Sequence, residues 1–172
     1  MAETKRPAVG ILMGSDSDMG VMEEAVSILK RFGVPYEVAV SSAHRTPRRT
    51  ALYARNARKR GIRIIIAGAG SAAHLAGFVA AETTLPVVGV PIESSPLKGL
   101  DALLSTVQMP GGVPVASMAI GKAGARNAAI FAVEILSLTD DRLAVALRDY
   151  RKEMERQVVA KSKKITVSSK GA

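Results

Sequence analysis

The sequence predicts an α/β protein: a three-layer αβα sandwich in which helices cover both faces of a five-stranded parallel sheet, plus a C-terminal helix. Short apolar runs alternate along the 172 residues with longer segments in which apolar residues recur at helical spacing. Several of the short runs are continuously apolar, which is typical of strands that are covered on both faces. An alternation of this kind joins parallel strands through right-handed crossover helices.

Five strands are predicted, each from an apolar run bounded by turn residues. They cover residues 8–13, 36–40, 62–67, 87–90 and 115–118. Because aromatic residues are only 3% of the chain, the core must consist mainly of Ala, Val, Ile, Leu and Met. Five strands favour the flavodoxin-like order 2-1-3-4-5 over a six-stranded dinucleotide-binding sheet.

The helices are predicted from apolar spacing and from end signals. Met22, Val26 and Leu29 recur at helical spacing after the first strand, and Thr46 with Pro47 is a typical cap and first position of the second helix. Further helices are predicted over residues 72–83, 97–107, 123–138 and 140–159. Because the sequence shows no interdomain linker, residues 1–162 are interpreted as one α/β domain that includes the last helix. Residues 163–172 are interpreted as a basic, flexible tail.

The composition excludes several classes of protein. The chain has no cysteine, so neither a disulfide framework nor a thiolate metal site is possible. The first ten residues lack the apolar core of a signal peptide, and no apolar run reaches the length of a membrane span, so a cytoplasmic location is expected. The net charge is +9, but residues 151–172 hold seven of the basic residues and no aromatic residue for base stacking. We therefore expect no membrane and no nucleic-acid partner.

Three loops that follow the first three strands differ from ordinary connectors. They cover residues 14–18, 41–47 and 68–75 and are rich in Gly, Ala and Ser. In the order 2-1-3 these loops are neighbours at the carboxyl ends of the strands, which is where such sheets bind ligands. Small residues let a ligand approach the backbone, and Ser hydroxyls and helix-start N–H groups hold anions. The sequence therefore predicts one cleft with anion-binding chemistry.

Four side chains of this cleft carry the predicted chemistry. Arg45 offers a planar fork of donors that matches a phosphate, and Asp18 can accept hydrogen bonds from sugar hydroxyls. His44 follows a strand and has no apolar periodicity to bury it, which favours a functional role. His74 is interpreted as a brace that hydrogen-bonds within its loop.

Two other interpretations stay open. Asp16, Ser17 and Asp18 could simply cap the first helix. Residues 68–73 fit the G-x-G-x-x-A dinucleotide signature, and Glu93 follows at a suitable distance, which would suit a flavin- or dinucleotide-binding protein. That motif lies in the third βα unit rather than the first, so the signal is weak.

The loops carry a resemblance to a known family. The runs MGSDSD, SAHRTP, GAGSAAHL, VQMPGGVPV and AIGKAGARNAA, in this order and spacing, resemble the class I 5-(carboxyamino)imidazole ribonucleotide mutases of bacterial purine synthesis. The resemblance extends from about residue 9 to residue 138. It implies an αβα fold, assembly as a homo-octamer, and functional pairing with the ATP-dependent synthetase that makes the substrate.

The resemblance also implies roles for the loop residues. His44 matches the catalytic histidine, and Ser15, Asp18 and Arg45 match residues that bind the ribose phosphate. Two residues depart from the pattern, because Ser71 stands where the family commonly has a second glycine and Ala76 where it commonly has Pro. The implied substrate-binding set is Gly14, Ser15, Asp16, Ser17, Asp18, Ser42, Ala43, Arg45, Gly70, Ser71, Ala72, His74 and Leu75.

The implied reaction moves a carboxyl group from the exocyclic nitrogen to ring carbon 4 of the nucleotide. An imidazole can act as both acid and base near neutral pH, so His44 would protonate the departing nitrogen and later deprotonate carbon 4. Neither a metal nor an organic cofactor is expected. A carboxylase that takes free carbon dioxide and aminoimidazole ribonucleotide is the alternative within the family.

Overall fold

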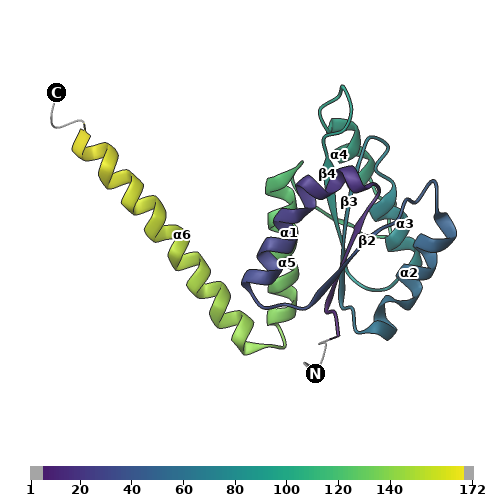
Figure 1. The fold of residues 1–172 in the computed structure, drawn as a ribbon, viewed down its shortest axis with the longest axis horizontal. Coiled ribbons are helices and arrows are strands. Elements are labelled where there is room, and N and C mark those ends of the chain that lie inside the picture. The colour runs from purple at the N-terminus through teal and green to yellow at the C-terminus, as the bar shows by residue number, and fades with distance from the viewer. Residues whose placement is uncertain (1–5, 169–172) are drawn as a thin grey trace. The chain divides into compact units, whose positions relative to one another are not determined.

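A parallel sheet of five strands forms the centre of the first of two compact units (Figure 1). The computed structural model describes residues 6–168; the first unit ends at Ala132 and the second begins at Val133. The strand order is β2-β1-β3-β4-β5 and each neighbouring pair is parallel, which confirms the predicted flavodoxin-like order. The strands are β1 (Val9–Met13), β2 (Tyr36–Val40), β3 (Ile64–Gly70), β4 (Val87–Ile92) and β5 (Ala116–Ser117).

Helices cover both faces of this sheet, so the first unit is the predicted αβα sandwich. The helices are η1 (Asp16–Asp18, a 3-10 turn), α1 (Met19–Arg31), α2 (Pro47–Arg60), α3 (Leu75–Glu82), α4 (Leu100–Val107), α5 (Lys122–Ser137) and α6 (Asp141–Ser168). Helix α1 and the part of α5 up to Ala132 lie on one face, while α2 and α3 lie on the other (Figure 1). Arg126 of α5 donates to Glu24 of α1 at 2.7 Å.

The apolar runs are buried as their pattern predicts. Every residue of β1 and β4 is buried, whereas the edge strand β2 is partly exposed. On one face Leu12, Ile65 and Ala67 of the sheet belong to the same apolar cluster as Ala54 of α2 and Val79 of α3. Since the central strands are covered along their length, polar ligands reach them only at the strand ends.

Several element ends differ from the prediction. Helix α4 begins at Leu100 rather than residue 97, because Lys98 and Gly99 have positive φ angles of 52° and 86°, which no α-helix contains. Helix α3 begins at Leu75 rather than residue 72, after Ser71 with its φ of 52°. Strand β3 in turn continues to Gly70. The last two shifts move the loop between β3 and α3 along the chain to residues 71–74 without changing its length.

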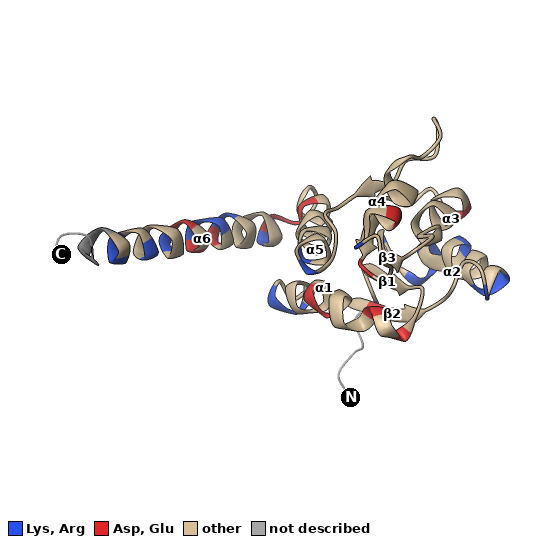
Figure 2. Cartoon of the chain, turned by 90° about the horizontal axis from the view of Figure 1, so that it is seen from above, with Lys and Arg blue, Asp and Glu red and all other residues tan. Residues whose placement is uncertain are grey.

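The second unit contains the end of α5 and the long helix α6. Helix α6 continues to Ser168, beyond the predicted end at residue 159, so residues 163–168 of the predicted tail are helical and 169–172 lie outside the described residues. The acidic residues of α6 end at Glu155, about halfway along the helix, and the charged residues that follow are basic (Figure 2). Arg151 forms an ion pair with Glu134 at 2.8 Å. Within residues 6–168, no helix combines the length and apolar character of a membrane span.

Candidate active site

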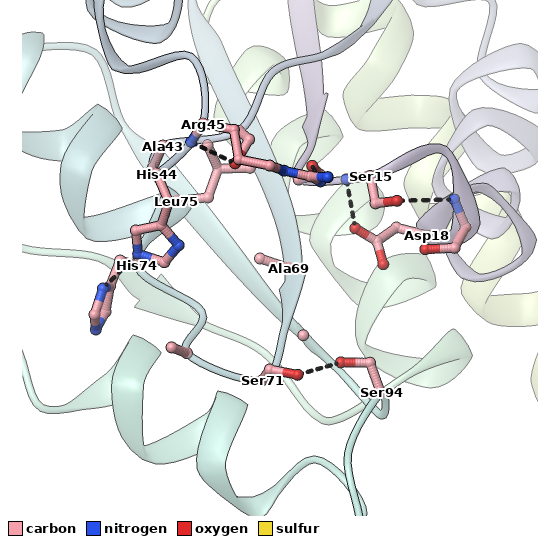
Figure 3. A pocket seen from close by; sticks show the side chains of 15 residues that line it. Ser15, Asp18, Ala43, His44, Arg45, Ala69, Ser71, His74, Leu75 and Ser94 are labelled. Carbon is pink, nitrogen blue, oxygen red and sulfur yellow. Dashed lines mark hydrogen bonds between the residues drawn. The ribbon is translucent and has the colours of Figure 1, made fainter.

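A pocket of about 340 Å³ opens at the carboxyl ends of the strands (Figure 3). The three loops predicted to be neighbours all line it, as do all of the predicted site residues except Asp16. Asp16 is exposed, and its carboxylate accepts from the hydroxyl of Ser15 at 3.0 Å and from the N–H of Ser17 at 3.1 Å. The volume lies in the range of small-molecule sites.

Two further residues line the pocket that sequence reasoning missed. Ala69 lies inside β3 next to Gly70, which was predicted, and Ser94 follows β4. A signal for Ser94 was available, because the loop after the fourth strand opens at the same edge of the sheet as the first three. The predicted cleft contained only the first three loops.

The loop after β1 is closed by a capping box. The Ser15 hydroxyl accepts from the N–H of Ser17 at 3.4 Å, while the Asp18 carboxylate accepts from the N–H of Ser15 at 3.0 Å. Capping and pocket lining therefore coexist in Asp18, whose side chain is almost fully buried. Burial raises the pKa of Asp18 above its ordinary value of 3.8, while hydrogen bonds from the backbone of Ser15 and Gly14 oppose that shift.

The loop after β2 is closed by hydrogen bonds that Ser42 forms with other residues of the loop. The carbonyl oxygen of Ser42 accepts from the N–H of Thr46 at 2.9 Å and from its hydroxyl at 2.9 Å. Thr46 was predicted to cap α2, but its side chain caps no helical N–H and instead closes this loop. The closed loop buries Ala43 and leaves His44 and Arg45 exposed at the pocket.

Arg45 links the first two loops. One terminal nitrogen of its guanidinium donates to the carbonyl oxygen of Gly14 at 3.4 Å, and its own N–H donates to the Ser42 hydroxyl at 3.1 Å. The long contact to Gly14 uses one of the five N–H donors of the guanidinium. The Arg45 guanidinium therefore lies at the Ser15 end of the pocket, and its other N–H groups can donate to an anion (Figure 3).

The two histidine rings meet edge to face at the other side of the pocket. Nε2 of His44 lies 2.8 Å from Nδ1 of His74, with ring centroids 4.9 Å apart and an interplanar angle of 84°. His74 is the N-cap residue of α3, yet its side chain makes no capping hydrogen bond. It thus forms a hydrogen bond, as predicted, but its partner is the other imidazole.

These contacts divide the pocket into three polar regions. Arg45 and Ser15 form a region with donors for an anion, the two histidines form a region for proton transfer, and Ser71 with Ser94 forms a third (Figure 3). Among residues 6–168, no three His, Asp or Glu side chains are grouped so that they could hold a metal ion. The arrangement suits acid–base chemistry on a phosphorylated ligand.

Comparison with known proteins gives one consistent family. The model of the AIR carboxylase family matches residues 8–157. The N5-carboxyaminoimidazole ribonucleotide mutase of Bacillus subtilis is 58% identical over 157 residues, which cover 91% of this chain and 96% of that protein. The crystal structure of Treponema denticola PurE is similar with a TM-score of 0.82 and 32% identity, over 92% of this chain and 98% of the other.

A relative with a different name is longer. The phosphoribosylaminoimidazole carboxylase of Saccharomyces cerevisiae is 52% identical over 160 residues, which cover 93% of this chain but only 28% of the yeast protein. The matched stretch is therefore one part of a larger polypeptide there. The match to the family model includes every residue that lines the pocket.

Proposed function

The chain belongs to the AIR carboxylase family, and we propose that His44 carries the proton in the mutase reaction for which its curated relatives are named. The protein is an isomerase that needs no ATP. It converts 5-(carboxyamino)imidazole ribonucleotide to 4-carboxy-5-aminoimidazole ribonucleotide in purine biosynthesis. One observation carries the residue roles: a single pocket brings His44 and Arg45 of the loop after β2 together with Asp18 of the loop after β1.

The nucleotide is anchored at the end of the pocket that is rich in donors. The phosphate accepts hydrogen bonds from the Arg45 guanidinium and from the Ser15 hydroxyl, which turns its hydrogen from Asp16 to the ligand, and the Asp18 carboxylate accepts from the ribose hydroxyls. The imidazole ring then lies between Ser42 and Ala43 on one side and the loop after β3 on the other. This orientation places the ring atoms that react beside His44.

The proton cycle uses both forms of His44. As imidazolium, His44 protonates the exocyclic nitrogen while the bond to the carboxyl group breaks, so that the bonding electrons stay on nitrogen and carbon dioxide is released in the pocket. Ring carbon 4 then attacks carbon dioxide. Neutral His44 removes the proton from carbon 4, which restores the aromatic ring and the imidazolium. Acid–base help of this kind contributes roughly a hundred- to ten-thousandfold in rate.

The direct test compares two substrates at low bicarbonate and without ATP. The carboxyamino nucleotide alone should give 4-carboxy product, and aminoimidazole ribonucleotide should give product only when carbon dioxide is supplied. The name of the yeast relative makes a carboxylase the second candidate. Product formed from carbon dioxide and aminoimidazole ribonucleotide, with none from the carboxyamino nucleotide, would establish that candidate and refute the mutase.

Assembly and location are further parts of this proposal. The chain forms a homo-octamer in the cytoplasm and receives its labile substrate from an ATP-dependent synthetase. Support for assembly comes from α6, where Met154, Val158 and Ile165 are 42%, 66% and 73% exposed and recur on one side of the helix. Apolar residues in such a row are typical of helices that pack against another chain.

A further inference from the structure

Ser71 and Ser94 form a hydroxyl pair in the third region of the pocket (Figure 3). Their Oγ atoms lie 3.0 Å apart, although 23 positions separate them in the sequence. Ser71 comes from the loop after β3, and Ser94 from the loop after β4. Both side chains are exposed, so the pair is open to a ligand.

The backbone at Ser71 has a conformation that favours glycine. Its φ of 52° lies in the left-handed region, which only one other non-glycine residue, Lys98, adopts within residues 6–168. A serine here costs folding free energy that a glycine would not cost. Backbone strain of this kind is found mostly at functional sites, where the side chain takes part in binding or catalysis.

The neighbouring residue brings the two loops into contact. A Cβ atom on Gly70 would overlap the Ser94 side chain and would lie 2.9 Å from the carbonyl oxygen of Ile92. The absence of that atom lets the end of β4 approach the end of β3. The hydroxyl pair therefore depends on a close backbone approach that the glycine permits.

Counting hydrogens shows what the pair can offer. Two hydroxyls carry two hydrogens, and the bond between Ser71 and Ser94 uses one of them. The second hydrogen has no acceptor within the pair, and it is free to donate into the pocket. A hydroxyl that already takes part in a hydrogen bond is also a better donor, because the bonds polarise one another.

We propose that the Ser71–Ser94 pair donates a hydrogen bond to the carboxylate that the enzyme moves onto ring carbon 4. This assignment rests on the proposed function, in which the ligand carries two anionic groups. The phosphate occupies the region of Arg45 and Ser15, and the histidines serve the ring atoms. Of the three polar regions of the pocket, the pair of serines is the one that neither the phosphate nor the ring atoms occupy, and a hydroxyl binds a charged acceptor more strongly than a neutral one.

The experiment compares two ligands by titration calorimetry: the 4-carboxy product and aminoimidazole ribonucleotide, which lacks the carboxyl group. Ser94→Ala should weaken binding of the carboxylated nucleotide by roughly 10- to 100-fold, as expected for a hydrogen bond to a charged group. Binding of aminoimidazole ribonucleotide should change less than twofold. Ser71→Gly should show the same selective loss together with a higher melting temperature, because glycine accepts the positive φ.

Two further variants make the test sharp. Ser95 lies in the same loop as Ser94 but does not line the pocket, and its hydroxyl accepts a hydrogen bond from the N–H of Leu97. Ser95→Ala should therefore leave the affinities for both nucleotides unchanged. The double variant Ser71→Gly with Ser94→Ala should lose little more than either single variant, because the two hydroxyls act as one unit.

The outcomes separate this inference from the function on which it rests. If Ser94→Ala weakened the binding of both ligands equally, or if Ser95→Ala caused the same selective loss, the carboxylate assignment would be overturned. Unchanged affinity in Ser94→Ala would overturn it as well. The proposed mutase activity would not be affected by any of these results. A wild-type protein that binds neither nucleotide would overturn both.

Discussion

Nε2 of His44 lies 2.8 Å from Nδ1 of His74, and these are the two histidines of the chain. In such a pair one nitrogen must donate and the other must accept. When His44 is an imidazolium, both of its nitrogens carry hydrogen, so His74 must present an unprotonated Nδ1. His74 is thus placed to select the orientation of the His44 ring and to accept from its charged form.

The His74 contact can be tested with two substitutions. His74→Ala removes the acceptor and should lower kcat roughly 10- to 100-fold, the worth of one hydrogen bond to a charged group, with KM almost unchanged. His74→Asn keeps an oxygen near the position of Nδ1 and should recover most of that loss. Steady-state kinetics across pH 6–9 check both variants. If His74→Ala raised KM and left kcat intact, His74 would be a ligand for substrate rather than a positioning residue for His44.

His44→Asn should remove turnover while nucleotide binding survives. Asparagine occupies a similar volume and cannot exchange a proton, so the expected fall in kcat is roughly a hundredfold or more. Product formation followed by absorbance measures turnover, and calorimetry measures the affinity for aminoimidazole ribonucleotide. Turnover close to that of the wild type would refute the proton-carrier role.

Arg45→Ala should chiefly weaken binding. A charge-assisted contact with phosphate is worth about 1.5–3 kcal/mol, so the affinity for the nucleotide should fall roughly 10- to 150-fold. Arg48→Ala is a matched control, because Arg48 is exposed on the first turn of α2 and does not line the pocket. Calorimetry with the nucleotide and with its dephosphorylated nucleoside gives the contrast. An equal loss for both ligands would remove Arg45 from the phosphate site.

The free energy of unfolding should depend on pH through Asp18. Burial raises its pKa in the folded state above 3.8, so over the pH range between the two values the unfolded chain has released a proton that the folded chain keeps. This contribution to stability is complete below pH 3.8 and is lost as the pH rises through the folded-state pKa. Relative to Asp18→Asn, which does not titrate, the wild type should therefore lose stability with rising pH.

Denaturant unfolding of the two proteins at closely spaced pH values measures that difference. Asp16→Asn, exposed on the same turn, controls for the loss of one negative charge near the start of α1. If the free energy of unfolding of the wild type rose with pH relative to that of Asp18→Asn, the assigned direction of the pKa shift would be contradicted.

The apolar row of α6 should hold subunits together. Val158→Glu places a charge in the row that Met154 and Ile165 share, and it should reduce the mass of the assembly in sedimentation. Val159→Glu makes the same change about 100° around the helix, outside the row, and should leave the mass unchanged. Dissociation by both variants, or by neither, would contradict an interface on that row.

Much of the fold could be predicted because its signals are local. The buried runs of β1 and β4, the start of α2 at Pro47 and the strand order all follow from burial patterns and end signals. The predicted start of α3 at residue 72 was wrong because the loop before the helix contains Ser71 at a positive φ. A serine in the sequence gives no reason to expect that conformation.

The candidate site divides in the same way. The sequence by itself determined three of the four loops that line the pocket, because parallel strands place their carboxyl ends on one edge, and it missed the loop after β4 that carries Ser94. Only the tertiary structure decided which side chains meet there: His44 with His74 across 30 positions, and Ser71 with Ser94 across 23. Such contacts depend on the backbone path of two separate loops, and no periodicity or spacing in the sequence encodes that path.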